Sequence, residues 1–197
     1  MATPGGQPHH ERVTTATIIL ALVVVVALAF DFTNGFHDTG NAMAASIATG
    51  ALSPKGAVTL AAILNLVGGL LSVEVALTVS NAVVNIQDSK GLPKPELMAN
   101  GGTMLLLIVF GGLIGGIIWN LATWLLGLPS SSSHALLGGL VGGTIGALGF
   151  AGVKWAGDGT KLDGVIGKVL LPSLLSPVIA MIVAATATRV IFMVTAR

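Results

Sequence analysis

The sequence contains no cysteine and very little charge. Without cysteine, the chain has no disulfides, thiolate metal sites or thiol nucleophiles. Charged residues make up 9% of the 197 residues, whereas an ordinary soluble domain has about 25%. So few charges cannot cover the surface of a soluble fold. The formal net charge of +1 comes without a basic tract, which argues against nucleic acid as a partner.

Long apolar runs take the place of the missing charge. Hydrophobic residues make up 53% of the chain, and the mean hydropathy is +0.92. The runs are continuous rather than alternating, which predicts helices and not an outer-membrane barrel. We therefore expect an all-α, multi-pass protein of the plasma membrane. The first run, Ala16–Phe30, also resembles a cleavable signal peptide, but the later runs require several spans in either case.

Polar stretches divide the chain into a tail and a transmembrane domain. Residues 1–13 are expected to be a disordered tail, and residues 14–197 a single transmembrane domain. The expected apolar segments are 14–30 continued by 42–52, then 55–86, 101–127, 135–153 and 165–194. Ser53 and Pro54 predict a helix start before the second of these. The stretches 87–100 and 154–163 are expected to be aqueous loops.

Glycine and proline predict local features of the later segments. The stretches 111–116 and 138–143 each offer pairs of small residues four positions apart, which favour close helix packing in membranes. Pro172 and Pro177 predict a kink in the last segment.

A polar interruption at residues 31–41 divides the first apolar segment. A lone charge at mid-membrane costs about 2.5–3.5 kcal/mol on insertion scales, so a carboxylate here indicates function. Gly35 and Gly40 would let the chain unwind, which predicts a broken first span. The alternative is a surface loop between two helices, although each flank is short for a full span.

The interruption also contains a candidate cation site. If a helix resumes there, Asp38 and Asn41 lie on one face, with Asn34 one turn earlier. Oxygen ligands of this kind suit Na⁺, and Asp38 could instead take a proton. His37 is either satisfied by a backbone carbonyl or part of a proton relay.

The second polar motif is a run of four serines, Ser130–Ser133, followed by His134. A glycine-rich apolar stretch comes next, so the serines predict a helix N-terminus, a re-entrant half-helix within the membrane. Free N–H groups and the positive end of the helix dipole attract anions, and serine hydroxyls can donate to them. A phosphate could be held there without arginine. The alternative is a serine cap in an ordinary hairpin loop.

The segment 55–86 carries further polar residues at helical spacing. Glu74 shares a face with Thr78, Asn81 and Asn85, whereas Asn65 points to the opposite side. Asn65 lies deep in the apolar stretch and is expected to face the site. Glu74 is either a coupling carboxylate or a snorkelling, water-facing residue.

The two motifs together resemble the inorganic phosphate transporter (PiT) family. The stretch Asn34–Ala42, followed by Gly50–Pro54, closely resembles the first signature of that family. The stretch Gly127–Ala135 resembles its serine–histidine signature, in the same order and at a similar separation. The resemblance implies a symporter, not an enzyme, that moves inorganic phosphate with Na⁺ or H⁺. It also implies two inverted repeats whose half-helices meet at a central site.

The resemblance also implies roles for single residues. Gly40 is usually alanine in the family, a mild departure. The expected phosphate ligands are Ser131, Ser132, Ser133, His134 and Asn41. The expected cation-coupling residues are Asp38, Asn34, Asn65 and Glu74. A Na⁺ ion is expected at Asp38, Asn41 and Asn65. No cofactor other than the coupling ion is expected.

Each signature occurs once, whereas the family carries a second copy of both. The chain is therefore expected to be the N-terminal repeat, either a fragment, a split-gene product or a half that pairs with a second repeat or another copy of itself. One alternative is a non-transporting membrane subunit. Another is an intramembrane hydrolase using a serine with His134 and Asp38, for which the chain has no Gly-x-Ser-x-Gly elbow.

Overall fold

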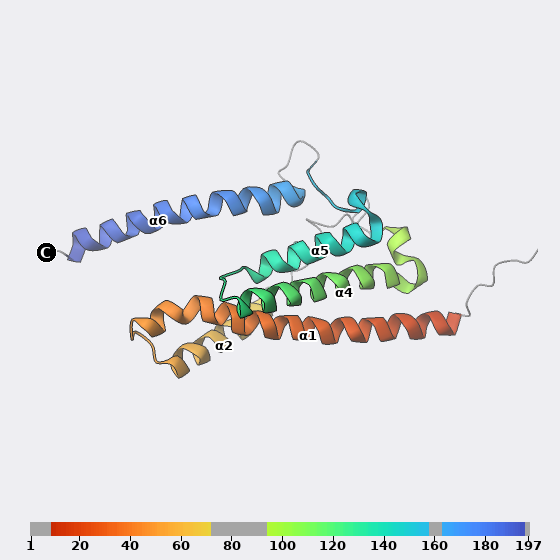
Figure 1. Ribbon diagram of the computed structural model, residues 1–197, viewed down its shortest axis with the longest axis horizontal. Helices are drawn as coiled ribbons and strands as arrows, with labels where there is room; N and C mark the ends of the chain where they lie inside the picture. Colours follow the sequence, from red (N-terminus) through yellow and green to blue (C-terminus); the bar gives the residue numbers. More distant parts are fainter. Residues whose placement is uncertain (1–8, 72–93, 158–162, 196–197) are drawn as a thin grey trace, which may run out of the picture. The chain divides into compact units, whose positions relative to one another are not determined.

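The computed structural model describes residues 9–71, 94–157 and 163–195, and this part of the chain is helical (Figure 1). The helices are α1 (His9–Ala48), α2 (Pro54–Leu71), α4 (Pro95–Leu125), α5 (Ser132–Leu148) and α6 (Leu171–Thr195), with a 3-10 turn η1 (Phe150–Gly152) and a π-helical turn η2 (Ile166–Leu170). Four stretches within them are long and apolar enough to cross a membrane. The predicted all-α, polytopic fold is confirmed. The chain divides into two compact units after Val153.

The first helix is continuous, so the predicted break in the first span is wrong. Helix α1 runs without interruption through residues 31–41, and neither Gly35 nor Gly40 has a positive φ. The side chains of His37, Asp38 and Asn41 find partners on α4, on α5 and in the turn between them, so the backbone has no need to unwind. At 1.5 Å per residue α1 is about 60 Å long, twice the hydrocarbon thickness of about 30 Å.

The first helix begins within residues 1–13, which were expected to be a disordered tail. Residues 9–13 form the first residues of α1, and residues 1–8 lie outside the described residues. Helix α1 ends before Gly50, whose φ of 74° is a left-handed conformation that favours glycine. After this corner Ser53 Oγ accepts a hydrogen bond from the N–H of Gly56 at 3.2 Å. The predicted helix start at Ser53 and Pro54 is confirmed.

Helix α4 starts earlier than predicted. It begins at Pro95, inside the stretch 87–100 that was expected to be a loop. Gly101 and Gly102 have φ values of 71° and 79° and form a corner, visible at the start of α4 in Figure 1. The part that is long and apolar enough to span a membrane is Gly101–Leu125.

Helix α4 packs against both α1 and α5. Its contact with α1 is a hydrophobic cluster built on Val23, Phe30 and Leu113. Its contact with α5 is closer, because glycines bring the two backbones together. A Cβ atom at Gly139 would lie 2.1 Å from the carbonyl oxygen of Gly112. The predicted close packing of the two glycine-rich stretches is confirmed, and they pack on each other.

We expect Gly139→Ala to destabilise the protein by about 1–3 kcal/mol, because the added methyl group overpacks the α4–α5 contact. Gly138→Ala is the matched control, since nothing lies within 4 Å of a Cβ at that position. It should be neutral or slightly stabilising, because alanine favours helix. Thermal unfolding in detergent measures both, and equal effects would contradict the packing described.

The second unit begins with an ion pair. The Lys154 ammonium donates to the Asp163 carboxylate, and Lys168 Nζ lies 3.5 Å from the other carboxylate oxygen. The hydrogen bond from Lys154, supported by the N–H of Gly164, lowers the pKa of Asp163. A π-helical turn ends at Leu170, two residues before Pro172, and Pro177 lies inside the continuous α6. The kink expected at these two prolines stays a prediction.

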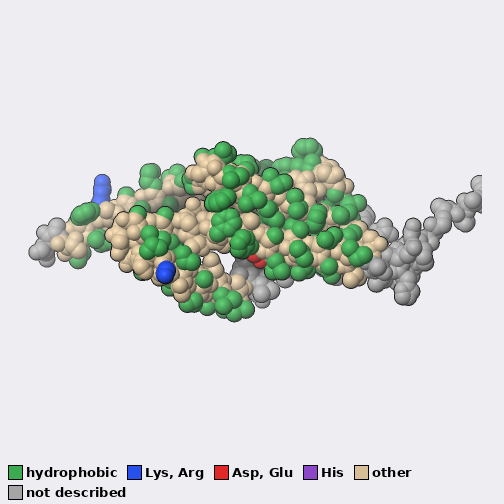
Figure 2. Space-filling model, turned by 60° about the horizontal axis from the view of Figure 1, so that its bottom comes forward, with side chains coloured by type: hydrophobic (Ala, Val, Ile, Leu, Met, Phe, Trp, Pro, Cys, Tyr) green, Lys and Arg blue, Asp and Glu red, His purple; other side chains and the backbone are tan. Residues whose placement is uncertain are grey.

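Apolar side chains cover the outside of the described helices. Leu28, Leu71 and Leu125 are 64%, 82% and 75% exposed. Figure 2 shows hydrophobic side chains over the visible face, with very few charged ones among them. Such a surface is unfavourable in water and suits hydrocarbon, as expected for a membrane protein.

Candidate functional site

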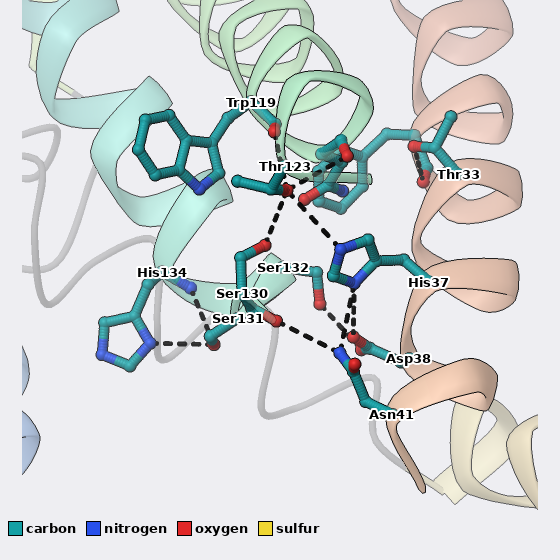
Figure 3. Close-up of polar contacts among 12 residues, drawn as sticks. Thr33, His37, Asp38, Asn41, Trp119, Thr123, Ser130, Ser131, Ser132 and His134 are labelled. Carbon is teal, nitrogen blue, oxygen red and sulfur yellow. Dashed lines mark hydrogen bonds and ion pairs between the residues drawn. The ribbon is translucent and has the colours of Figure 1, made fainter. Parts of the chain in front are cut away.

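The two polar motifs meet where α1 passes the start of α5 (Figure 3). Ser132 Oγ donates a hydrogen bond of 2.8 Å to Asp38 Oδ2. Asn41 Nδ2 lies 3.5 Å from the carbonyl oxygen of Ser130, to which it donates. Residues about 90 positions apart in the chain therefore form one polar site, as the resemblance led us to expect.

The serine motif starts α5. Ser131 is the N-cap residue, and its Oγ accepts from the N–H of His134 at 3.4 Å and lies 2.9 Å from His134 Nδ1. Ser132 is the first helical residue and is 2% exposed. The N–H groups of Ser132 and Ser133 belong to the first turn, where a helix provides no acceptor. The predicted helix N-terminus is confirmed, and capping uses only one of the four serines.

His37 is buried among side chains, with 6% exposure. Its Nδ1 lies 3.3 Å from Asn41 Nδ2 and 3.8 Å from Asp38 Oδ1. Its Nε2 lies 3.5 Å from Thr123 Oγ1. If the ring is neutral and Nδ1 accepts from Asn41, then Nε2 carries the hydrogen and donates to Thr123. Both ring nitrogens thus face side chains, not the backbone carbonyl that was one expectation.

Thr123 joins the network from α4, and the sequence interpretation missed it. Its side chain is 4% exposed, and its Oγ1 lies 3.0 Å from Ser130 Oγ. It also lies within hydrogen-bond distance of the carbonyl oxygens of Trp119 and Asn120, at 2.9 and 3.1 Å. One signal in the sequence could have revealed Thr123. The apolar run 101–127 contains a polar pair three residues apart, Asn120 and Thr123.

Asp38 is the charged group at the centre of this site. Its side chain is 46% exposed, so it remains accessible while Ser132 holds one of its oxygens. No group of three or more His, Asp or Glu side chains that could hold a metal occurs within the described residues. A cation at Asp38 would therefore need amide, hydroxyl or backbone oxygens as its other ligands.

Asn65 is not brought together with Asp38 and Asn41. It lines a cleft of about 480 Å³ between α1 and α2, together with Gly35, Phe36, Thr39, Gly40, Met43, Ala44, Ile47, Val58 and Ala62. At 100° per residue, the α1 side of this cleft lies on the face opposite to Asp38 and Asn41. The Na⁺ site expected from these three residues is therefore not assembled in this structure.

Of the two other expected coupling residues, Asn34 is in the described part of the chain and Glu74 is not. Asn34 lies on α1 one turn before His37, and its Oδ1 is buried without a hydrogen-bond partner in the described part of the chain. Glu74 lies outside the described residues. The structure thus joins Asp38, Asn41 and the serine motif, and places Asn34 next to them on the same helix.

Several known proteins similar to this chain are named as phosphate transporters. Residues 34–197 match a family described as the phosphate transporter family. The chain is 51% identical over 177 residues to a probable low-affinity inorganic phosphate transporter of Mycobacterium tuberculosis, which covers 90% of this chain and 37% of that protein. It is 40% identical over 165 residues to the protein of that name from Bacillus subtilis, covering 84% of this chain and 43% of that one.

A similar match comes from Escherichia coli. The low-affinity inorganic phosphate transporter PitB is 36% identical over 171 residues, which cover 85% of this chain and 32% of that protein. The chain thus spans well under half the length of these relatives. No solved structure matches the chain.

Proposed function

The chain belongs to the phosphate transporter family, and from this premise we propose that it supplies a site for inorganic phosphate in a secondary transporter. One observation carries the proposal: the hydroxyl of Ser132, at the N-terminus of α5, donates a hydrogen bond to the carboxylate of Asp38 in the last third of α1. This contact places an anion-attracting helix start next to the acidic residue that a coupling cation would neutralise.

Phosphate binds at the start of α5 in this proposal. The free N–H groups of Ser132 and Ser133 and the positive end of the helix dipole attract an anion. The hydroxyl groups of Ser131 and Ser133 can donate to phosphate oxygens, whereas the single hydroxyl hydrogen of Ser132 is donated to Asp38. The side chains of His134 and Asn41 flank the same turn. A phosphate oxyanion can thus be held without arginine, consistent with the lack of any Lys or Arg in either motif.

Asp38 couples phosphate binding to a cation. Two unit negative charges 4 Å apart repel by about 4 kcal/mol at an effective dielectric constant of 20. Phosphate therefore binds well only when a proton or Na⁺ neutralises Asp38, with Asn41 supplying a further oxygen. Because cation and phosphate bind more tightly together than apart, movement of one drives movement of the other.

The contacts favour transport over hydrolysis. Ser131 Oγ and His134 Nδ1 lie 2.9 Å apart, a distance typical of a nucleophile and its base. However, Ser131 serves as the cap of α5, and Asp38 bonds Ser132. The relatives are named as transporters, and none of the matches described above is an enzyme.

We propose further that a second repeat or another copy of the chain completes the site. The Asp38 side chain is half exposed and therefore accessible to such a partner. Alternating access requires two parts that move relative to each other around the bound substrate. One repeat alone can therefore bind phosphate without accumulating it.

Reconstituted uptake tests this proposal. Labelled phosphate uptake would be measured in liposomes that hold this chain alone, or this chain with the remaining portion of a longer relative. Cation-driven accumulation is expected only for the combination. Accumulation by the chain alone would contradict the need for a second repeat, and its absence from both, with both proteins folded, would contradict transport.

A further inference from the structure

Helices α1 and α4 run in the same direction (Figure 1) and pack on each other, and two contacts give their register. In the first contact, a Cβ atom added at Gly116 of α4 would lie 2.8 Å from Phe30 Cε2 of α1. Two turns further on, Thr123 Oγ1 lies 3.5 Å from His37 Nε2. In both pairs the α4 residue follows the α1 residue by 86 positions. The same register places Asn120 opposite Asn34, between these two contacts.

Asn34 and Asn120 form a layer between α1 and α4 that contains buried amide atoms without hydrogen-bond partners. Asn120 is 0% exposed, and neither its Nδ2 nor its Oδ1 has a hydrogen-bond partner among the described residues. The same holds for Asn34 Oδ1. Burial of amide atoms without a hydrogen-bond partner is unfavourable and uncommon in folded proteins. The neighbouring layer at Phe30 is apolar and well packed, so the defect is local.

We propose that α1 and α4 separate at the Asn34–Asn120 layer and admit water, so that the packed arrangement is one of two states. In the packed state the amide atoms are unsatisfied. In the separated state a water molecule can donate to Asn34 Oδ1 and Asn120 Oδ1 and accept from Asn120 Nδ2. Because the two states then differ little in free energy, a ligand bound elsewhere on α1 can change their relative populations.

The position of the layer gives this opening a role. It lies one helical turn from the His37–Thr123 contact, which ties α1 to the end of α4 beside Asp38. Separation of the helices at Asn120 would loosen that contact, and occupancy of the phosphate site would in turn bias the separation. Asn120 is then a positioning residue. This role rests on the proposed function, whereas the opening itself does not.

The absence of cysteine from the chain allows a direct test. Single variants Asn34→Cys and Asn120→Cys would be labelled with a small, water-soluble methanethiosulfonate reagent. The matched control is Thr144→Cys, because Thr144 is also 0% exposed and its hydroxyl is bonded to the Leu140 carbonyl at 2.7 Å. Asn120→Cys should react at least ten times faster than this control. Asn34 is partly exposed in the packed state, so Asn34→Cys serves only as the reporter in the next experiment. Rates equal to that of Thr144→Cys would overturn the proposal.

A second variant separates opening from a disturbance caused by cysteine itself. Asn120→Leu keeps the side-chain size and removes the unsatisfied amide, so it should raise the unfolding temperature and slow labelling of Asn34→Cys at least tenfold. Thr144→Val, which loses a satisfied hydroxyl, should lower the unfolding temperature. A destabilised Asn120→Leu variant with unchanged labelling would overturn the proposal. Protection of Asn34→Cys by Na⁺ but not by choline would identify a cation, not water, as the occupant and would also overturn it.

Discussion

Asp38→Asn is expected to reduce cation-driven phosphate uptake at least a hundredfold and to remove the dependence of phosphate binding on Na⁺ or pH. The variant keeps the size of the side chain and an oxygen that can accept from Ser132 Oγ. It removes the negative charge that the coupling cation neutralises. Phosphate should therefore bind the variant without a cation at least as tightly as it binds the native protein, because the repulsion is gone.

Equilibrium binding of labelled phosphate over a range of Na⁺ concentration and pH measures this effect. Asp163→Asn is the matched control, since Asp163 pairs with Lys154 outside the site. It should leave the cation dependence unchanged. If coupling survives in Asp38→Asn, the coupling role belongs to another group. The next candidates are Asp31, the first residue of the polar interruption at 31–41, and Glu74.

The double variant Ser132→Ala, Ser133→Ala is expected to weaken phosphate binding about a hundredfold. A hydrogen bond to a charged group contributes about 1.5–3 kcal/mol, and 1.4 kcal/mol corresponds to a factor of ten in affinity. The cap residue Ser131 is retained, so α5 should still form. The unfolding temperature should fall only by what the lost hydrogen bond between Ser132 and Asp38 contributes.

Ser53→Ala is the matched control for this double variant. It removes the hydroxyl that accepts from Gly56 at the start of α2, so it should lower stability without changing phosphate affinity. Labelled phosphate binding and thermal unfolding distinguish the two outcomes. Unchanged phosphate affinity in the double variant would remove the serine motif from the binding site.

The start of α5 could be predicted from the sequence, because a serine cap before an apolar run is a local signal. The continuous α1 could not. Glycines and polar residues inside an apolar segment predict unwinding when their partners are unknown, and the partners of Asp38 and His37 lie on α4 and α5, about 90 positions away. Tertiary contacts therefore decided the conformation of this segment.

Which residues form the site was only partly predictable, because the direction of a side chain also depends on tertiary contacts. Asn65 was assigned to it because it is a polar residue in an apolar helix. Its direction, however, depends on how the corner at Gly50 sets the rotation of α2 against α1, and it lines the opposite cleft. Thr123 meets the same criterion of polarity as Asn65 and was passed over, yet it contacts His37.

The most direct test of the central claim is to observe which groups phosphate touches. Amide NMR signals of the native chain in lipid nanodiscs would be followed during titration with inorganic phosphate, and with chloride at equal ionic strength. The N–H signals of Ser132 and Ser133 should move with phosphate, saturate, and stay in place with chloride. Phosphate binding that leaves these two signals unmoved, or a titration to which neither responds at any concentration, would contradict a phosphate site at the start of α5.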